Sequence, residues 1–187
     1  MIGYAFCGSY CTFERSFEAM SALVERGYEL LPIFSFNAAT TDTRFGRADD
    51  FLARAEALTG RAPILSIRDA EPLGPKVKLD ALVVSPCTGN TLAKLALGIT
   101  DTPVTMAVKA HLRQGRPLLL SLASNDALSA NLKNIAVLLE KKSVYFVPLC
   151  QDDPEKKPSS LVAAFEMLPL CLEEALAGRQ RRPLFLS

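Results

Sequence analysis

The sequence predicts an α/β protein, a Rossmann-like three-layer sandwich in which helices cover both faces of a mostly parallel sheet. Short apolar runs of strand length alternate along the chain with segments whose apolar residues recur at helical spacing. Such alternation is typical of strand–helix–strand units, and their crossovers place helices on the faces of the sheet. No long linker, internal repeat or low-complexity tract divides the chain. Residues 1–187 are therefore expected to form a single domain.

Six apolar runs have the length and composition of buried strands. The predicted strands cover residues 2–7, 30–36, 64–67, 81–85, 118–122 and 144–148. Two segments between them, 37–46 and 71–75, are rich in polar residues or in proline and glycine, and both predict loops.

Helical spacing of apolar residues follows most of these strands. Phe13, Phe17, Met20 and Val24 recur every three or four residues, and Gly27 is a plausible stop. The other predicted helices cover 47–59, 90–98, a stretch after Pro103, a stretch marked by Leu128, Leu132, Ile135 and Leu139, and a closing helix from Leu161 to Leu176. Pro169 lies inside the closing helix and is expected to bend it.

Composition narrows the classes of function. The chain has 187 residues, 49% of them hydrophobic, which is enough for one full core. With 21 basic and 20 acidic residues, the formal charge of +1 gives no chain-wide field that attracts nucleic acid or an anionic membrane. The first residues lack the basic segment and apolar core of a signal peptide, and no apolar run is long enough to span a bilayer. A cytoplasmic protein is expected.

The cysteines and the single histidine do not predict a metal site. The five cysteines form an odd set with no C-x-x-C pair, as is typical of reduced thiols, and they are residues 7, 11, 87, 150 and 171. His111 is far from any cysteine cluster, so no zinc site is predicted. It is expected to be a partly exposed helix residue and no catalyst. Cys7 and Cys87 each end a predicted strand, where small apolar fillers are favoured over reactive thiols.

Polar loops follow three of the predicted strands, at 7–12, 85–91 and 123–126. In a parallel sheet these loops lie at the same edge, where ligands bind. Glycine and hydroxyl residues before a helix suit a phosphate, and neutral donors and acceptors suit the polar edge of a flavin ring. Each loop alone could instead be an ordinary helix cap. The chain has neither G-x-G-x-x-G nor the nucleotide-binding G-x-x-x-x-G-K-[ST], so a mononucleotide fits better than NAD or ATP.

The run 79–101 resembles the signature of the flavoprotein family that contains the flavin-dependent cysteine decarboxylases. The P-A-S-A-N-T element of that family is matched by 86–91, its G-I-A-D-N element by 98–102, and its T-G-S turn by 7–9. The resemblance covers most of the chain and implies a flavoprotein-like fold that binds FMN. The cofactor-binding residues that we expect from the polar loops and the resemblance are Gly8, Ser9, Tyr10, Ser35, Ser85, Pro86, Thr88, Asn90, Ser124 and Asn125.

Two departures from the family disfavour decarboxylation. The decarboxylases carry a histidine before the strand that leads to P-A-S-A-N-T, and the corresponding stretch 64–69 has none. Their P-x-M-N-x-x-M substrate element is replaced by 124–128. Decarboxylation is therefore disfavoured, and the sequence does not identify a catalytic residue.

Four stretches, 43–46, 70–76, 124–128 and 151–158, resemble a subgroup of the family that acts in bacterial sporulation. That resemblance implies a homo-oligomer that works with a partner protein carrying NAD(P), in the oxidation of a small cyclic dicarboxylate. We expect Arg44, Asn90 and Lys156, or Lys157 in its place, to bind the substrate, and solvated loop charges are the alternative for these cations. Two other functions stay open: an assembly protein of flavin-type fold without a redox role, and an FMN-dependent decarboxylase.

Overall fold

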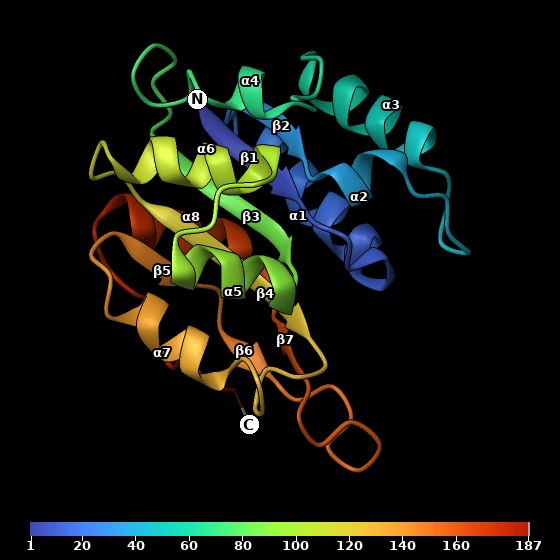
Figure 1. Ribbon diagram of the computed structural model, residues 1–187, viewed down its shortest axis with the longest axis vertical. Coiled ribbons are helices and arrows are strands. Elements are labelled where there is room, and N and C mark those ends of the chain that lie inside the picture. The colour runs from blue at the N-terminus through green and yellow to red at the C-terminus, as the bar shows by residue number, and fades with distance from the viewer. Residues whose placement is uncertain (187) are drawn as a thin grey trace.

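A single mixed sheet organises the computed structural model, which describes residues 1–186 and leaves the last residue of the predicted domain outside (Figure 1). Its parallel strands are β1 (Ile2–Phe6), β2 (Leu30–Phe34), β3 (Ala81–Cys87), β4 (Leu118–Ser124) and β5 (Val144–Phe146). They lie in the order β2-β1-β3-β4-β5. At the carboxyl end of β4, β7 (Leu161–Ala163) pairs antiparallel with its last two residues, and β6 (Leu149–Cys150) pairs antiparallel with β7.

Helices cover both faces, so the predicted three-layer α/β sandwich is confirmed. On one face lie α1 (Phe13–Glu25) and α8 (Leu168–Leu176). On the other lie α5 (Gly89–Leu97), α6 (Pro103–Leu112) and α7 (Leu132–Leu139), with the short α4 (Ile67–Ala70) against α6. The remaining helices, α2 (Phe36–Thr40) and α3 (Ala48–Thr59), flank β2, and two 3₁₀ turns, η1 (Tyr10–Thr12) and η2 (Phe165–Met167), precede α1 and α8.

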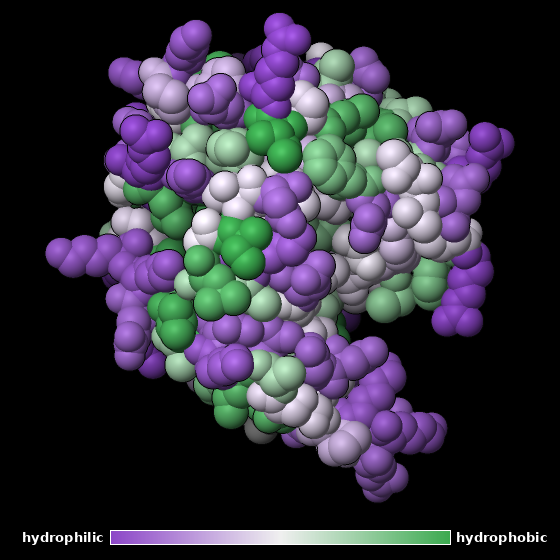
Figure 2. All heavy atoms as spheres, viewed as in Figure 1, coloured by the Kyte–Doolittle hydropathy of each residue, from purple (hydrophilic) through white to green (hydrophobic). Residues whose placement is uncertain are grey.

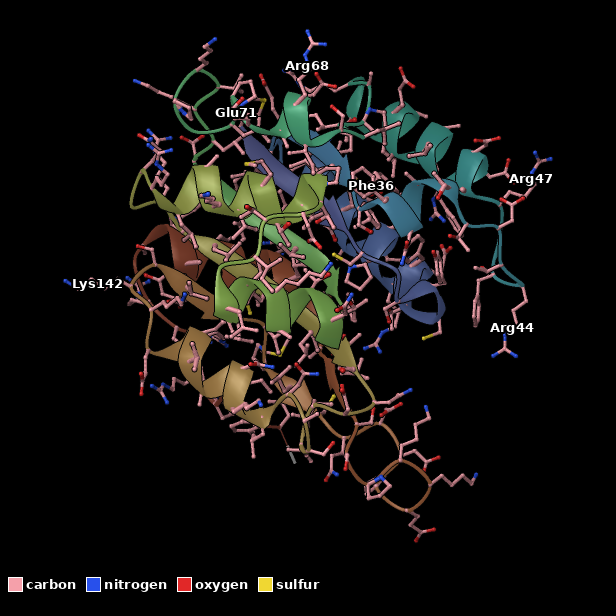
Figure 3. All side chains as sticks on the ribbon, viewed as in Figure 1. Phe36, Arg44, Arg47, Arg68, Glu71 and Lys142 are labelled. Carbon is pink, nitrogen blue, oxygen red and sulfur yellow. The ribbon has the colours of Figure 1, made fainter. Side chains whose placement is uncertain are left out.

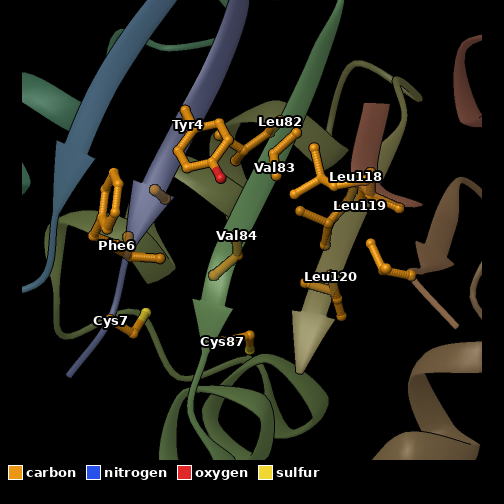
Figure 4. Packing of buried hydrophobic residues seen from close by; sticks show 14 of the residues in the cluster. Tyr4, Phe6, Cys7, Leu82, Val83, Val84, Cys87, Leu118, Leu119 and Leu120 are labelled. Atoms are coloured by element: carbon orange, nitrogen blue, oxygen red, sulfur yellow. The ribbon is translucent and has the colours of Figure 1, made fainter. Parts of the chain in front are cut away.

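The core lies between these layers and is richest around β1. Every residue of β1 and β3 is buried, as expected for strands covered on both faces. The ring of Phe6 stacks on Phe34 at 4.7 Å between centroids and contacts Phe17 at the same distance. Figure 4 shows Tyr4 and Phe6 on β1 beside the aliphatic residues of β3 and β4. Burial of each such ring contributes about 2–3 kcal/mol, so these aromatic residues stabilise the core around β1.

The predicted strand at 64–67 is wrong. Only Ile64 bridges the sheet, with Ile33 of β2. Ser66 then begins α4 by accepting a hydrogen bond from the Asp69 amide at 3.0 Å. A serine cap therefore outweighs the strand preference of Ile64 and Ile67.

The predicted closing helix is also wrong over its first half. Residues 161–163 form β7, and the helix begins only at Leu168. Pro169 lies in the first turn of α8, where its missing N–H costs no intrahelical bond, and it does not bend the helix. Similarly, the helix expected from Leu128 begins at Leu132, after turns at 125–131.

Two smaller differences concern the end of β2. The predicted strand 30–36 ends at Phe34, because the Ser35 hydroxyl accepts from the Ala38 amide at 3.3 Å and starts α2 inside the expected loop.

Among the described residues, no helix is long and apolar enough to cross a membrane.

Candidate functional site

A cleft lies where the strand order reverses between β1 and β3. In open α/β sheets ligands bind at this switch point, outside the carboxyl ends of the strands. The cleft encloses about 380 Å³, and we call it the switch-point cleft. It is lined by Gly8, Ser35, Phe36, Asn37, Thr88, Asn90, Thr91, Lys94, Asp101 and Thr102.

Three helices begin at the switch-point cleft, each with a hydroxyl cap. Ser35 caps α2, Thr88 caps α5 by accepting from the Thr91 amide at 3.2 Å, and Thr102 caps α6 by accepting from the Thr105 amide at 3.1 Å. The first amides of a helix have no intrahelical acceptor, and the helix dipole makes that end positive. The convergence of three such ends favours an anion such as a phosphate.

The charged side chains of the cleft neutralise each other. Lys94 Nζ lies 2.8 Å from Asp101 Oδ2, and the lysine side chain is only 23% exposed. The hydrogen bond from Lys94 lowers the pKa of Asp101, so this carboxylate is ionised and paired. Attraction for an anion therefore comes mainly from backbone amides, and the cleft offers no unpaired carboxylate as a base.

The Phe36 side chain and a hydrogen bond from Tyr10 complete the cleft. Phe36, which Figure 3 labels at the start of α2, is 44% exposed and gives the cleft an apolar surface. The Tyr10 hydroxyl donates to the Asn37 carbonyl at 2.7 Å, which fixes the loop after β1 against α2. A β-carbon at Gly8 would lie 3.5 Å from the Tyr10 ring, an ordinary contact. The Tyr10 ring thus covers the loop at Gly8.

A second cavity of about 320 Å³ adjoins the same loop. Gly8 lines the switch-point cleft and its neighbour Ser9 lines this cavity, which we call the β4-end cavity. Its lining consists of Ser9, Cys11, Thr12, Arg15, Ala123, Ser124, Asn125, Asp152, Lys157 and Val162.

A polar network holds the loop after β4 against α5. Ser124 Oγ donates to Asp126 Oδ1, and Asn131 Nδ2 donates to Asp126 Oδ2 at 2.9 Å. These hydrogen bonds, that of Ser124 first, lower the pKa of Asp126. Asn134 Nδ2 in turn donates to Asn131 Oδ1 at 2.8 Å. A β-carbon at Gly89 would lie 2.7 Å from Asp126 Oδ1 and closer still to Ser124 Oγ, so this close approach requires glycine.

The structure divides the expected cofactor residues into three groups. Gly8, Ser35, Thr88 and Asn90 line the switch-point cleft, and Tyr10 covers the loop beside it. Ser9, Ser124 and Asn125 line the β4-end cavity. The third group, Ser85 and Pro86, is buried in β3 and lines neither cavity. The Ser85 carbonyl accepts a hydrogen bond from Ser16 Oγ at 2.6 Å.

Of the expected substrate residues, Asn90 lines the switch-point cleft, and of the two alternative lysines only Lys157 lines a cavity. Arg44 lies at the tip of an exposed loop and points away from the body of the protein (Figure 3). Its guanidinium lies 4.9 Å from the centre of the Phe45 ring. Lys156 is exposed and lines neither cavity, whereas its neighbour Lys157 lines the β4-end cavity.

The sequence did not identify several lining residues. Thr91 lies in the expected loop 85–91 and Lys157 was expected as the alternative to Lys156, but six other lining residues were not expected: Phe36, Asn37, Lys94, Asp101, Thr102 and Arg15. The match of 98–102 to the G-I-A-D-N element was a usable signal for Asp101 and Thr102. The others are ordinary residues of a helix or loop until the fold brings them together.

The cysteines at the strand ends are buried, and so is the histidine. Figure 4 shows Cys7 and Cys87 at the ends of β1 and β3. Burial raises the pKa of Cys7 to about 11 and that of Cys87 well above its ordinary value, so both are neutral fillers. The expectation that His111 is partly exposed is wrong: it is fully buried, with Nε2 2.9 Å from the Pro117 carbonyl oxygen. Pro117 precedes β4, so His111 lies at the opposite edge of the sheet from the cleft.

Comparison of the sequence with known proteins identifies the family to which the chain belongs. The model of the family described as Flavoprotein matches residues 5–166. The chain is 45% identical over 186 residues to the B subunit of dipicolinate synthase from Bacillus subtilis strain 168, an alignment that covers 100% of this chain and 93% of the relative. Within residues 1–186 of the structure, no group of three or more histidine, cysteine or acidic residues could hold a metal ion.

Two solved structures place the fold in the same family. The B subunit of dipicolinate synthase from Bacillus halodurans superposes with a TM-score of 0.91 at 40% identity, covering 100% of this chain and 95% of that one. A dodecameric FMN-dependent UbiX-like decarboxylase from Escherichia coli O157:H7 superposes with a TM-score of 0.65 at 26% identity, covering 79% of each chain. The chain therefore belongs to the flavoprotein family, within which it groups with the dipicolinate synthase B subunits.

Proposed function

We propose that this chain binds FMN in the switch-point cleft and acts with the nicotinamide-binding A subunit of dipicolinate synthase in the oxidation of dihydrodipicolinate to dipicolinate during sporulation. The observation that carries the proposal is the convergence of three helix N-termini on one cleft at the switch point of the sheet. The similarity to the B subunit of dipicolinate synthase supports the reaction.

The donors of the cleft fit FMN. Backbone amides at the starts of α2 and α5 would hold the phosphate, with Ser35 and Gly8 beside them. The carboxamide of Asn90 offers a neutral donor and a neutral acceptor to the ring edge, and Phe36 offers an apolar surface to its face. When bound, a flavin supplies an acceptor for the electron pair that leaves the substrate.

The residues of this chain bind and orient rather than move protons. The one carboxylate in the cleft, Asp101, is paired with Lys94, and the lining of the cleft includes neither histidine nor cysteine. Aromatisation of a dihydro ring also removes a proton, so the base belongs to the partner protein or to solvent.

Because the cleft offers no base, a second function is also supported: an assembly protein of flavin-type fold without a redox role. Decarboxylation has weaker support. The decarboxylase histidine is missing from 64–69, although the structural neighbour from Escherichia coli is named an FMN-dependent decarboxylase. Loss of turnover in a reconstituted pair of the two proteins when FMN is omitted would separate the redox role from the assembly role.

Titration of FMN into the purified chain, followed by flavin fluorescence, tests the proposed site. Asn90→Asp adds a negative charge to the switch-point cleft at constant size and replaces the amide donor by a carboxylate that only accepts, so FMN binding should weaken about tenfold or more. Asn125→Asp is the matched control, because it makes the same change in the β4-end cavity. Equal affinity of the two variants for FMN would show that FMN does not bind in the switch-point cleft.

Self-association is also part of the proposal. Figure 2 shows apolar side chains gathered over the region of α5 and α7. Leu97, the last residue of α5, is 73% exposed, and both Ile99 and the α7 residue Val137 are half-exposed. The structural neighbour from Escherichia coli is named dodecameric. Leu97→Gln should lower the mass measured by light scattering, whereas Leu170→Gln on the opposite face should not; an unchanged mass in Leu97→Gln would exclude this surface.

A further inference from the structure

We propose that the β4-end cavity binds a carboxylate group of a small acid, with Arg15 and Lys157 as its cationic contacts. The choice of a carboxylic acid as ligand rests on the proposed function, because the relative is named for a dicarboxylate. The site itself rests on the lining of the cavity.

The Arg15 guanidinium is held in position, but its N–H donors make only weak contacts within the protein. It lies 5.0 Å from the centre of the Phe165 ring, which orients its plane. Its polar contacts are long: Nη2 is 3.4 Å from the Ala163 carbonyl oxygen and 3.5 Å from Glu166 Oε2. The Glu166 side chain is 72% exposed, so this ion pair is weak. A carboxylate in the cavity can therefore take the paired N–H donors of Arg15.

Lys157 brings the second positive charge from the segment 151–158, which approaches α1 in space. Its ammonium lies 2.9 Å from Asp152 Oδ2, and this contact raises the pKa of Lys157 and keeps it charged. Gln151 Nε2 donates to the Pro158 carbonyl at 2.9 Å and closes the segment into a loop. With Arg15, Lys157 and Asp152 ionised, the lining carries a net charge of +1, which matches one carboxylate.

Neutral donors complete the site. Ser9 Oγ has a single contact among the described residues, with Cys11 Sγ at 4.0 Å, so its hydroxyl proton is available. Asn125 Oδ1 accepts from Ser160 Oγ at 3.5 Å, which leaves the amide NH₂ of Asn125 as a donor. Two cations and two neutral donors around one cavity are the groups that a carboxylate needs.

The position of the β4-end cavity suits an acid that reacts with the proposed cofactor. Gly8 faces the switch-point cleft and Ser9 the β4-end cavity, so only the loop after β1 separates the two. An acid anchored at Arg15 would thus lie next to the cleft.

Calorimetric titration tests the acid site with pyridine-2,6-dicarboxylate, pyridine-2-carboxylate and uncharged pyridine as probes. Both acids should bind the wild-type chain and pyridine should not. Arg15→Gln should weaken acid binding about tenfold or more. Arg26→Gln is the matched control, since Arg26 belongs to the end of α1, is equally exposed and pairs with Glu173. Lys157→Gln should weaken binding, whereas Lys156→Gln should not.

Alkylation of Cys11 locates the acid. Cys11 lines the β4-end cavity and is exposed, whereas Cys7 and Cys87 are buried. Bound acid should slow its reaction with iodoacetamide, followed by mass spectrometry of the peptide. Absence of acid binding, equal effects of Arg15→Gln and Arg26→Gln, or unprotected Cys11 at saturating acid would each overturn the proposal. Acid binding with protection of Cys11 but without FMN binding would uphold this site while refuting the proposed flavin site.

Discussion

Replacement of Gly89 by alanine tests the packing between the loop after β4 and the start of α5. The new β-carbon would lie 2.6 Å from Asn131 Nδ2 and 2.7 Å from Asp126 Oδ1, with Ser124 Oγ nearer still. All three atoms belong to one hydrogen-bonded network, so none can move alone. Overpacking of this kind costs about 1–3 kcal/mol, and Gly89 is the first residue of α5, outside the helix interior where the better helix preference of alanine would offset that cost. Gly89→Ala should therefore lower the unfolding free energy by about 1–3 kcal/mol.

Urea denaturation of a double-mutant cycle measures this effect and its cause. Ser124→Ala removes the nearest atom, so Gly89→Ala should cost less in the Ser124→Ala background, with a coupling of about 0.5–1.5 kcal/mol. Gly98→Ala is a poor control because Gly98 has a φ of +74°. A Gly89→Ala chain as stable as the wild type, or costs that add without coupling, would refute the tight approach of this loop to α5.

Three further predictions concern stability. Tyr4→Phe should cost about 1–2 kcal/mol in urea denaturation, because the buried hydroxyl donates to the Ser16 carbonyl at 2.7 Å; an unchanged midpoint would contradict this. The folded chain holds the Cys7 proton to about pH 11 against an ordinary pKa of 9.0, so unfolding free energy should fall as pH rises from 9 to 11, and Cys7→Ala should reduce that fall by roughly 2–3 kcal/mol. Arg54→Gln should cost about 0.5–1 kcal/mol at neutral pH, since Arg54 contacts Glu14 at 2.7 and 2.8 Å. Because Arg54 lowers the pKa of Glu14, that cost should shrink as pH falls below 4.5, and a pH-independent cost would contradict the pairing.

Local sequence patterns predicted the parallel strands well, because strands buried on both faces are continuous apolar runs. These patterns failed where the same residues are compatible with both the helical and the strand period. Leu161 and Phe165 fit helical spacing, but residues 161–163 form β7 because they pair with the last two residues of β4. At 64–67, a serine cap outweighed two β-branched residues. Both outcomes depend on contacts or caps that a short window does not weigh.

The candidate site was predictable where cap chemistry shows in the sequence. Thr88 was expected because hydroxyl residues follow an apolar strand, and Ser35 was expected from the family resemblance; both line the cleft. Ser85 follows the same pattern but remains inside β3, which continues to Cys87. Arg15 looks like an ordinary exposed helix charge, and only the fold brings it to the Ala163 carbonyl, 148 residues away.

Comparison of FMN with riboflavin tests the central claim most directly. The cleft is proposed to hold FMN through the phosphate, at amides that begin α2 and α5. Titrated into the same preparation and followed by flavin fluorescence, FMN should bind saturably, and riboflavin, which lacks the phosphate, should bind at least about tenfold more weakly. Equal affinity for the two flavins, or binding of neither, would contradict the proposed flavin site.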